Sequence, residues 1–162
     1  MKGEFRELPK ESREGDKHTA DYTDEEGNYY NLDVYKVIKA SDGLTVESVG
    51  INSLENFTDD NCWYDENGQW LNPRQIVEAY KSTPDLNEII KIHPEWREHI
   101  EKIENSDYQN HPLIFIEDKF IDGMHKLVKA LIHGSSEVKV KRFIRLPQET
   151  LRLLEYREET PR

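Results

Sequence analysis

Hydrophobic residues recur along the chain with two different periods, and these periods predict where strands and helices lie. Five segments alternate apolar with polar residues, or are rich in β-branched and aromatic side chains, as strands are: 29–38, 44–51, 113–116, 119–121 and 137–144. Ser-Asp-Gly at 41–43 predicts a turn that joins the first two strands into a hairpin. The acidic pair at 117–118 predicts a second turn, between the third and fourth strands.

Apolar residues at helical spacing predict four further segments: about 73–81, 84–104, 123–133 and 147–156. Asn72 is expected to cap the first helix, with Pro73 as its first residue. Pro94 is expected to kink or break the second. Asp122 is the expected cap of the third, and Gly134 follows its end. The stretch between the second strand and the first helix predicts a loop-rich connection with a short helical turn.

This mixture of elements predicts an α/β (α+β) protein, and 162 residues suit one domain with a terminal extension. Residues 1–28 alternate charges and contain few large aliphatic side chains, which is typical of a mobile N-terminal arm. Residues 29–162 are expected to form the domain. The low hydrophobic share, 35%, beside a charged share of 34%, agrees with part of the chain lying outside the core.

The charge is acidic overall but unevenly distributed. A net charge of −11 argues against affinity for a nucleic-acid backbone, which requires clustered Lys and Arg. Residues 51–110 carry 13 acidic against 5 basic side chains, whereas residues 111–145 carry 4 against 7. A local site for an anion is therefore compatible with the global acidity.

Neither a membrane span nor a disulfide is expected. No run approaches the roughly 20 apolar residues of a span, and the first residues lack an apolar signal region, so we expect a soluble, cytoplasmic protein. Cys62 is the single cysteine and cannot form an intramolecular disulfide. Its acidic neighbours would raise its pKa, so a structural role is favoured over a catalytic one.

The stretch FIDGMHKLVKALIHG, residues 120–134, carries the clearest candidate chemistry. A helix N-terminus favours anions, and Gly123 would let a ligand approach the backbone closely. Lys126 and Lys129 have the wrong sign for the dipole there, by roughly 0.3–1 kcal/mol each, unless a bound phosphate reverses the penalty. His125 and Lys126 would then be donors to it. The alternative is that Asp122 only caps the helix and that the cations face water.

The run PLIFIEDKFIDGMHKLVKALIHGSSEVKVKRF resembles the core of the ParB/sulfiredoxin fold. It is more closely similar to small bacterial ParB-like proteins that carry DGMHR at this place, and the stretches DDNCWYD and NPRQIVEA also fit their pattern. The resemblance covers roughly residues 44–146, with 84–104 as a helical insertion. It implies a small mixed sheet with packed helices.

The resemblance also implies a nucleotide site. Four residues would hold the phosphates of ATP, ADP or CTP, with Mg²⁺: Gly123, Met124, His125 and Lys126. Asp122 would orient or deprotonate an acceptor hydroxyl, with His125 and Glu55 as further catalytic candidates. The implied activity is phosphoryl transfer to a small molecule, or hydrolysis of the nucleotide. The alternatives are a non-enzymatic, nucleotide-responsive module that docks a basic partner through the acidic insertion, and, more remotely, a nuclease.

Three departures from the family narrow this expectation. Met124 occupies the place of the sulfiredoxin cysteine, so repair of sulfinic acids has no nucleophile. Lys126 replaces the usual arginine and exchanges a bidentate fork for a point charge. No helix-turn-helix domain follows the motif, so the resemblance does not extend to chromosome partitioning.

The remaining candidates have two interpretations each. Arg74 either contacts a phosphate from a second side or is an exposed first-turn residue, which is favoured. Four acidic residues have the oxygen ligands that Mg²⁺ or Ca²⁺ prefers, without calcium-loop spacing: Asp59, Asp60, Asp65 and Glu66. Three aromatic residues either stack on a ligand or, as favoured, belong to the core: Trp63, Tyr64 and Trp70. Four histidines show no ligand pairing: His93, His99, His111 and His133.

Overall fold

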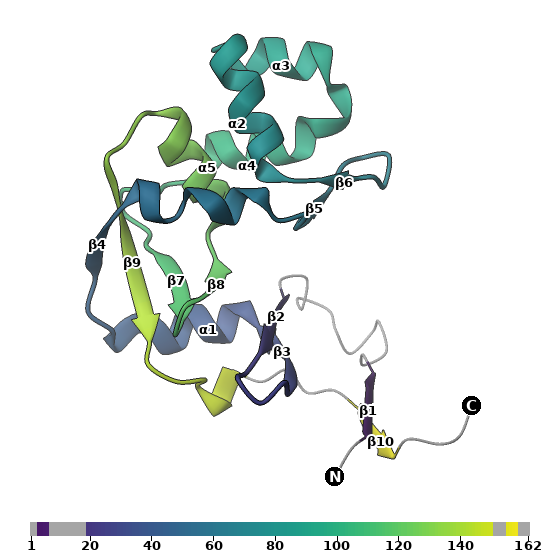
Figure 1. Ribbon diagram of the computed structural model, residues 1–162, viewed down its shortest axis with the longest axis vertical. Helices are drawn as coiled ribbons and strands as arrows, with labels where there is room; N and C mark the ends of the chain where they lie inside the picture. The colour runs from purple at the N-terminus through teal and green to yellow at the C-terminus, as the bar shows by residue number, and fades with distance from the viewer. Residues whose placement is uncertain (1–2, 7–18, 151–154, 159–162) are drawn as a thin grey trace.

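A four-stranded mixed sheet forms the centre of the computed structural model, which describes residues 3–6, 19–150 and 155–158 (Figure 1). Its strands, in spatial order, are β4 (Glu47–Gly50), β9 (Glu137–Phe143), β7 (Leu113–Ile116) and β8 (Lys119–Asp122). β9 runs antiparallel to β4 and parallel to β7, and β7 pairs antiparallel with β8. The chain is therefore a mixed α and β protein, as the sequence predicts.

The burial of both faces of β7 explains why its run of apolar residues is unbroken. Leu113 and Phe115 point to one face of the sheet and pack in a cluster with Leu127 of α5 (Met124–Ile132). Ile114 and Ile116 point to the other face and pack in a different cluster. A strand covered on both faces has no polar side to expose, so alternation disappears from its sequence.

Three helices gather at one end of the sheet (Figure 1): α2 (Pro73–Ser82), α3 (Leu86–Ile92) and α4 (Arg97–Asn105). Their apolar faces bury a cluster that also includes Val128 of α5. Asn72 caps α2 in a reciprocal box with Gln75, and a 3-10 turn at Pro94–Trp96 separates α3 from α4. The predicted cap and the predicted break at Pro94 are both confirmed.

The predicted hairpin of 29–38 with 44–51 is wrong. Residues 29–38 divide into β3 (Tyr29–Asp33) and α1 (Val34–Ala40). Asp33 ends the strand because its side chain accepts a hydrogen bond from the Lys36 amide, at 3.3 Å, and so caps a helix. Val34 and Val37 then bury one helical face. β3 pairs with β2 (Thr19–Thr23), while the second predicted strand shortens to β4 and pairs with β9.

The ends of the chain also differ from the predicted boundaries. The boundary at residue 28 falls inside the β2–β3 hairpin, so 19–28 belongs to the folded body. Within the rest of the predicted arm, β1 (Gly3–Arg6) pairs with β10 (Glu155–Glu158), and residues 1–2 and 7–18 lie outside the described residues. The predicted helix 147–156 is wrong, because a 3-10 turn at Gln148–Thr150 is followed, after the undescribed 151–154, by β10.

The loop-rich connection predicted after the second strand is confirmed. It contains 3-10 turns at Ile51–Ser53 and Glu55–Asp59 and then the short hairpin of β5 (Trp63–Tyr64) with β6 (Trp70–Leu71). Within the described ranges, none of the helices has both the length and the apolar character needed to cross a membrane.

Candidate functional site

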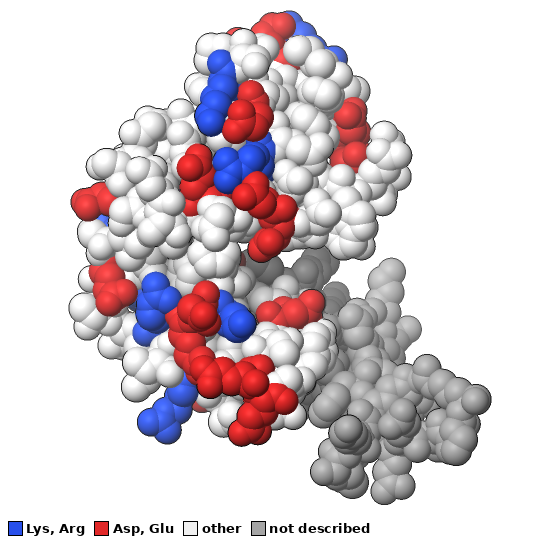
Figure 2. Space-filling model, viewed as in Figure 1, with Lys and Arg blue, Asp and Glu red and all other residues white. Residues whose placement is uncertain are grey.

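A cleft of about 970 Å³ lies where β8 ends and α5 begins. Its walls come from the β8–α5 junction, from α4, from the β5–β6 hairpin and from β2. Figure 2 shows the hollow between the helical end of the molecule and the β2–β3 hairpin, on a face where acidic and basic side chains are interspersed. The cleft contains every residue of the DGMHK motif: Asp122, Gly123, Met124, His125 and Lys126.

Gly123 brings the chain from the strand into the helix. It adopts the left-handed conformation, with φ of +116°, and it is the cap residue of α5. The prediction of Asp122 as cap is therefore wrong by one residue, since Asp122 is still the last residue of β8. A Cβ at position 123 would lie 2.5 Å from Cδ2 of Leu113, so the junction packs directly on β7. The predicted close approach at Gly123 is made to Leu113 of the neighbouring strand.

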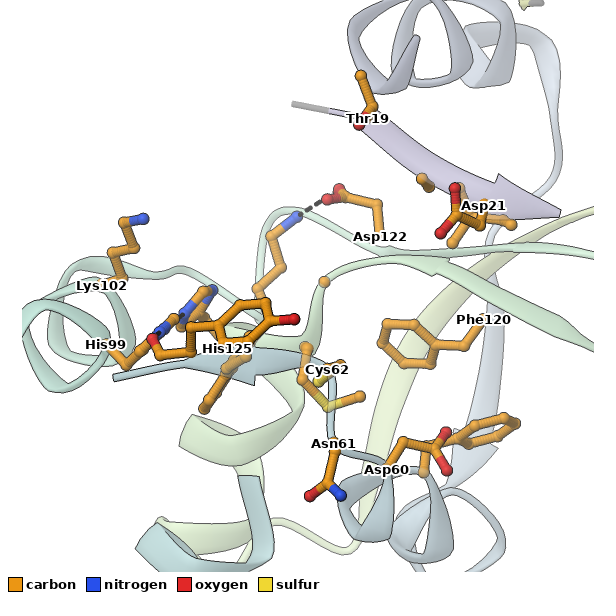
Figure 3. A pocket seen from close by; sticks show the side chains of 18 of the residues that line it. Thr19, Asp21, Asp60, Asn61, Cys62, His99, Lys102, Phe120, Asp122 and His125 are labelled. Carbon is orange, nitrogen blue, oxygen red and sulfur yellow. Dashed lines mark hydrogen bonds and ion pairs between the residues drawn. The ribbon is translucent and has the colours of Figure 1, made fainter. Parts of the chain in front are cut away.

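Lys126 and Asp122 form an ion pair across the first turn of α5. Nζ of Lys126 lies 3.9 Å from Oδ2 of Asp122, and the two side chains are 21% and 10% exposed (Figure 3). The cation at the helix start is thus paired with the carboxylate that precedes the helix. Both groups line the cleft, where an anionic ligand would compete with Asp122 for Lys126.

Lys129 has a different role from Lys126. Its Nζ donates to the backbone oxygens of Glu104 and Ser106, at 2.8 and 2.7 Å. These carbonyls lie at the C-terminal end of α4, where the helix dipole favours a cation. Lys129 also lies in the last turn of α5, where a cation is favourable, so the predicted penalty for its sign is wrong.

His125 is paired with His99, a residue for which the sequence indicated no partner. Nδ1 of His99 lies 3.0 Å from Nε2 of His125, and Nε2 of His99 lies 2.8 Å from the backbone oxygen of Tyr64. Both imidazoles stack on the buried ring of Trp63, at centroid distances of 4.5 and 4.4 Å. Desolvation lowers the pKa of His99, the Tyr64 carbonyl opposes that shift, and Lys102 adds to it.

One sequence feature places His99 near the core. It lies three residues after Trp96 and four before Ile103, both of which are buried. This spacing puts His99 on the inner face of α4. What the sequence does not show is that α4 lies against α5, so that His99 meets a histidine 26 positions away.

Arg74 and Glu55 pair with each other and lie outside the lining of the cleft. The Arg74 guanidinium pairs with the Asp59 carboxylate, donates to the backbone oxygen of Glu55 at 3.1 Å, and lies 3.7 Å from the Glu55 carboxylate. These contacts link α2 to the 3-10 turn before it. The structure therefore assigns Arg74 a structural contact, and Glu55 does not line the cleft that Asp122 lines.

The aromatic residues divide into one core residue and two surface residues. Trp63 is 8% exposed, as the core interpretation predicts. The same interpretation is wrong for Tyr64 and Trp70, which line the cleft and are 56% and 57% exposed. Their rings stack on each other with centroids 4.2 Å apart. The β5–β6 hairpin thus presents a flat aromatic surface at the cleft.

Acidic residues approach the cleft from three separate segments. Figure 3 shows Asp21 of β2 and Asp122 on one side, with Asp60 across from them. The predicted acidic cluster is dispersed, because Asp59 pairs with Arg74 and Asp65 accepts hydrogen bonds from the amides of its own turn. In the part of the chain that the structure describes, no three His, Cys, Asp or Glu side chains are grouped as ligands of one metal ion.

Cys62 lines the cleft beside this acidic group. Desolvation in the cleft raises the pKa of its thiol to about 11, and the Asp60 carboxylate adds to that shift. The thiol is therefore protonated near neutral pH and is a poor nucleophile. Cys62 is exposed, and its raised pKa argues against a catalytic role, as the sequence also does.

Comparison with protein-family models, with curated proteins and with solved structures gives no match for this chain. The resemblance to the ParB/sulfiredoxin fold therefore remains a prediction from the sequence.

Proposed function

We propose that the chain binds a nucleoside di- or triphosphate in this cleft, in the manner of ParB/sulfiredoxin-like proteins, and transfers or hydrolyses a phosphoryl group. The observation that carries the proposal is the meeting of Asp122, His125 and Lys126 in one cleft, at the start of α5. The amides in the first turn of a helix lack acceptors within the helix, and the dipole favours negative charge there. Lys126 adds a cation at the same end.

The charges of the cleft favour a nucleotide that carries a divalent cation. Among the described residues that line it, Lys126 and Lys102 are cations, but Asp21, Asp60 and Asp122 also line it and would repel a free polyphosphate. Mg²⁺ bound to the phosphates would neutralise part of their charge and provide Lewis-acid stabilisation. The three carboxylates would then lie around a complex of much lower negative charge. We therefore expect the magnesium complex of ATP to bind more tightly than ATP in excess chelator.

The exposed rings of Tyr64 and Trp70 support a planar ligand. Stacking of a base on an aromatic side chain is worth about 1–3 kcal/mol and tolerates different bases. Since both rings line the same cleft as Lys126, one ligand could contact the hairpin with its base and α5 with its phosphates. This arrangement supports a nucleotide more than free phosphate.

The proposed chemistry assigns different tasks to Lys126 and Asp122. Lys126 binds phosphate oxygens and leaves its ion pair with Asp122. Asp122, which precedes the same helix turn, would accept the proton of an attacking hydroxyl or water. Catalysis would come mainly from positioning and charge stabilisation, as is usual in phosphoryl transfer.

Thermal unfolding with ATP, ADP, CTP and GTP, each with Mg²⁺, tests the proposal. A nucleotide at a hundred times its Kd stabilises the folded state by about 2.7 kcal/mol. For a chain of this length, that corresponds to a rise in Tm of roughly 5–10 °C. Lys126→Ala should abolish the rise, whereas the matched variant Lys129→Ala should retain it. No rise with any of the four nucleotides would overturn the proposal.

A further inference from the structure

The β5–β6 hairpin is held against the helical end of the molecule at two points. The backbone oxygen of Tyr64 can only accept, so Nε2 of His99 in α4 donates to it, at 2.8 Å. The amide of Glu66, in the turn of the hairpin, donates to the backbone oxygen of Glu95 just before α4, at 2.9 Å. Each strand of the hairpin has only two residues, and so short a hairpin is not stable in isolation. Its position therefore depends on contacts such as these with the rest of the molecule.

His99 joins this hairpin to the start of α5. Its Nδ1 lies 3.0 Å from Nε2 of His125, while its Nε2 binds the Tyr64 carbonyl. Trp63, the residue before Tyr64, is buried and stacks on both imidazoles, at centroid distances of 4.5 and 4.4 Å. Successive side chains of a strand point to opposite faces, so the burial of Trp63 turns Tyr64 outward. The position of the Tyr64 ring relative to the motif at 122–126 is thus set through His99 and Trp63.

Tyr64 and Trp70 form the outward face of the hairpin. They are direct cross-strand partners, and their rings stack with centroids 4.2 Å apart and planes 24° from parallel. Each residue nevertheless stays more than half exposed and lines the cleft. Charged side chains line the same cleft from several elements, which disfavours an apolar partner segment, because such a segment would bury those charges. A planar group that is linked to an anion suits both the exposed rings and the charged surroundings.

We propose that His99 is a positioning residue that fixes the Tyr64–Trp70 pair relative to α5, and that the base of the bound nucleotide stacks on this pair. The first part concerns the chain alone. The second part rests on the proposed function and names the residues that recognise the base. Because the hairpin is already fixed, a nucleotide would not have to order it on binding, and contacts at the base and at the phosphates would both contribute to affinity.

Amide hydrogen exchange of the full chain without a ligand tests the first part. The Glu66 amide bonds to Glu95, outside the hairpin, so its exchange rate reports how firmly the hairpin is held in place. His99→Gln keeps a donor near the place of Nε2, whereas His99→Leu removes that donor at similar bulk. Exchange at Glu66 should be roughly 2- to 12-fold faster in His99→Leu, the equivalent of one lost hydrogen bond, and close to the wild-type rate in His99→Gln. The Gly27 amide, in the β2–β3 turn, is the control and should not change.

Three results of this measurement would overturn the positioning role. They are an unchanged rate at Glu66 in His99→Leu, the same acceleration in both variants, and the same acceleration at Gly27.

Calorimetric titration with ATP and with inorganic tripolyphosphate, each with Mg²⁺, tests the second part. Trp70→Ala should weaken ATP binding by roughly 5- to 150-fold, the range for stacking of one base, and should leave tripolyphosphate binding unchanged. Tyr35→Ala is the matched control, because Tyr35 is about as exposed as Trp70 but lies on α1, outside the cleft lining. It should bind both ligands as wild type does. If Trp70→Ala binds ATP as tightly as wild type, or loses tripolyphosphate to the same extent, the base subsite is overturned while the proposed function stands.

A double substitution shows whether His99 acts on the ligand through the stacking pair. His99→Leu should weaken ATP binding about twofold or more, because the hairpin is then out of place in part of the molecules, and His99→Gln should restore it. In the Trp70→Ala background, His99→Leu should have little further effect. Additive losses in the double variant would overturn the link between His99 and the pair. If ATP does not bind wild type at all, the proposed function and the base subsite fall together, whereas the exchange measurement still decides the positioning role of His99.

Discussion

Gly123 combines a conformation and a contact that exclude a larger residue. Its φ of +116° lies in the left-handed region, where L side chains are strained, and its Cα faces Leu113 too closely for a Cβ. Gly27 also has a positive φ, +85°, but a Cβ there would meet nothing within 4 Å. The two glycines therefore separate backbone strain from steric overlap.

Gly123→Ala should lower the free energy of unfolding by roughly 2–5 kcal/mol, because strain and overpacking against Leu113 add. Gly27→Ala should cost about 1 kcal/mol, from strain alone. Urea denaturation of the two variants measures both values. Equal losses of stability in the two variants would mean that Leu113 moves aside at little cost. The burial of Leu113 on strand β7 argues against that result.

Lys126 and Lys129 lie one turn apart on α5, and alanine should lower stability more at Lys129 than at Lys126. Lys129→Ala should lower the free energy of unfolding by about 1–3 kcal/mol, because two carbonyls at the end of α4 lose a charged donor. Lys126→Ala should cost less, because Nζ of Lys126 lies 3.9 Å from the Asp122 carboxylate, whereas Nζ of Lys129 makes hydrogen bonds of 2.8 and 2.7 Å. Chemical denaturation without a ligand checks the order, and the reverse order would contradict these assignments.

At the scale of elements, the segment 84–104 is part of the core as well as of the cleft. Ile100 and Ile103 of α4 are fully buried in the cluster shared with α2 and α5. His99 and Lys102 of the same helix line the cleft. The sequence predicts that this segment is an insertion with a docking surface. In the structure, α4 contributes side chains both to the hydrophobic core and to the lining of the cleft.

Ile103→Ala should therefore cost about 2–5 kcal/mol, the usual range for emptying a buried isoleucine site. Ile92→Ala in α3 is the matched control, because Ile92 is 62% exposed and its loss should change stability by less than about 0.5 kcal/mol. Denaturation midpoints compare the two. A small effect of Ile103→Ala would show that α4 is only loosely attached.

At the scale of the whole molecule, stability should respond to the protonation of His99. Because burial lowers the pKa of His99 below its ordinary 6.5, the unfolded chain binds more protons than the folded chain between the two values. The free energy of unfolding should therefore fall as pH is lowered through 6.5. Asp24 and Asp107, whose pKa values are lowered by hydrogen bonds from Asn28 and Asn110, act only in the acid range below 3.8.

Measuring unfolding from pH 8 to pH 5 in wild type and His99→Gln checks this dependence. Wild type should lose stability relative to the variant on acidification, because the glutamine does not titrate. A parallel decline in both proteins would show that other groups cause the loss.

Local signals in the sequence predict much of the fold. The cap and proline at 72–73, the break at Pro94 and the buried run at 113–116 are each encoded by neighbouring residues. The pairing of strands is not encoded locally, so the sequence predicts the wrong partner for β3. The capping role of Asp33 is hidden in a segment rich in β-branched and aromatic residues. The His99–His125 pair depends on the packing of two helices, which no single local pattern encodes.

The residues of the candidate site also divide into those that a local sequence pattern predicts and those that it does not. The motif at 122–126 is continuous in sequence and forms one wall of the cleft. Arg74 and Glu55 lie far from this motif in sequence, and the structure places them together but outside the cleft lining. Tyr64 and Trp70 are exposed because a two-residue strand pair cannot bury both of its faces.

Mapping the amide shifts of the ¹⁵N-labelled chain during titration with ATP and Mg²⁺ tests the central claim most directly. The nucleotide-binding account predicts that the largest shifts fall at Gly123, Met124, His125 and Lys126, with smaller ones at Tyr64 and Trp70. Saturable shifts that leave residues 122–126 unchanged, or no saturable shifts at all, would contradict it.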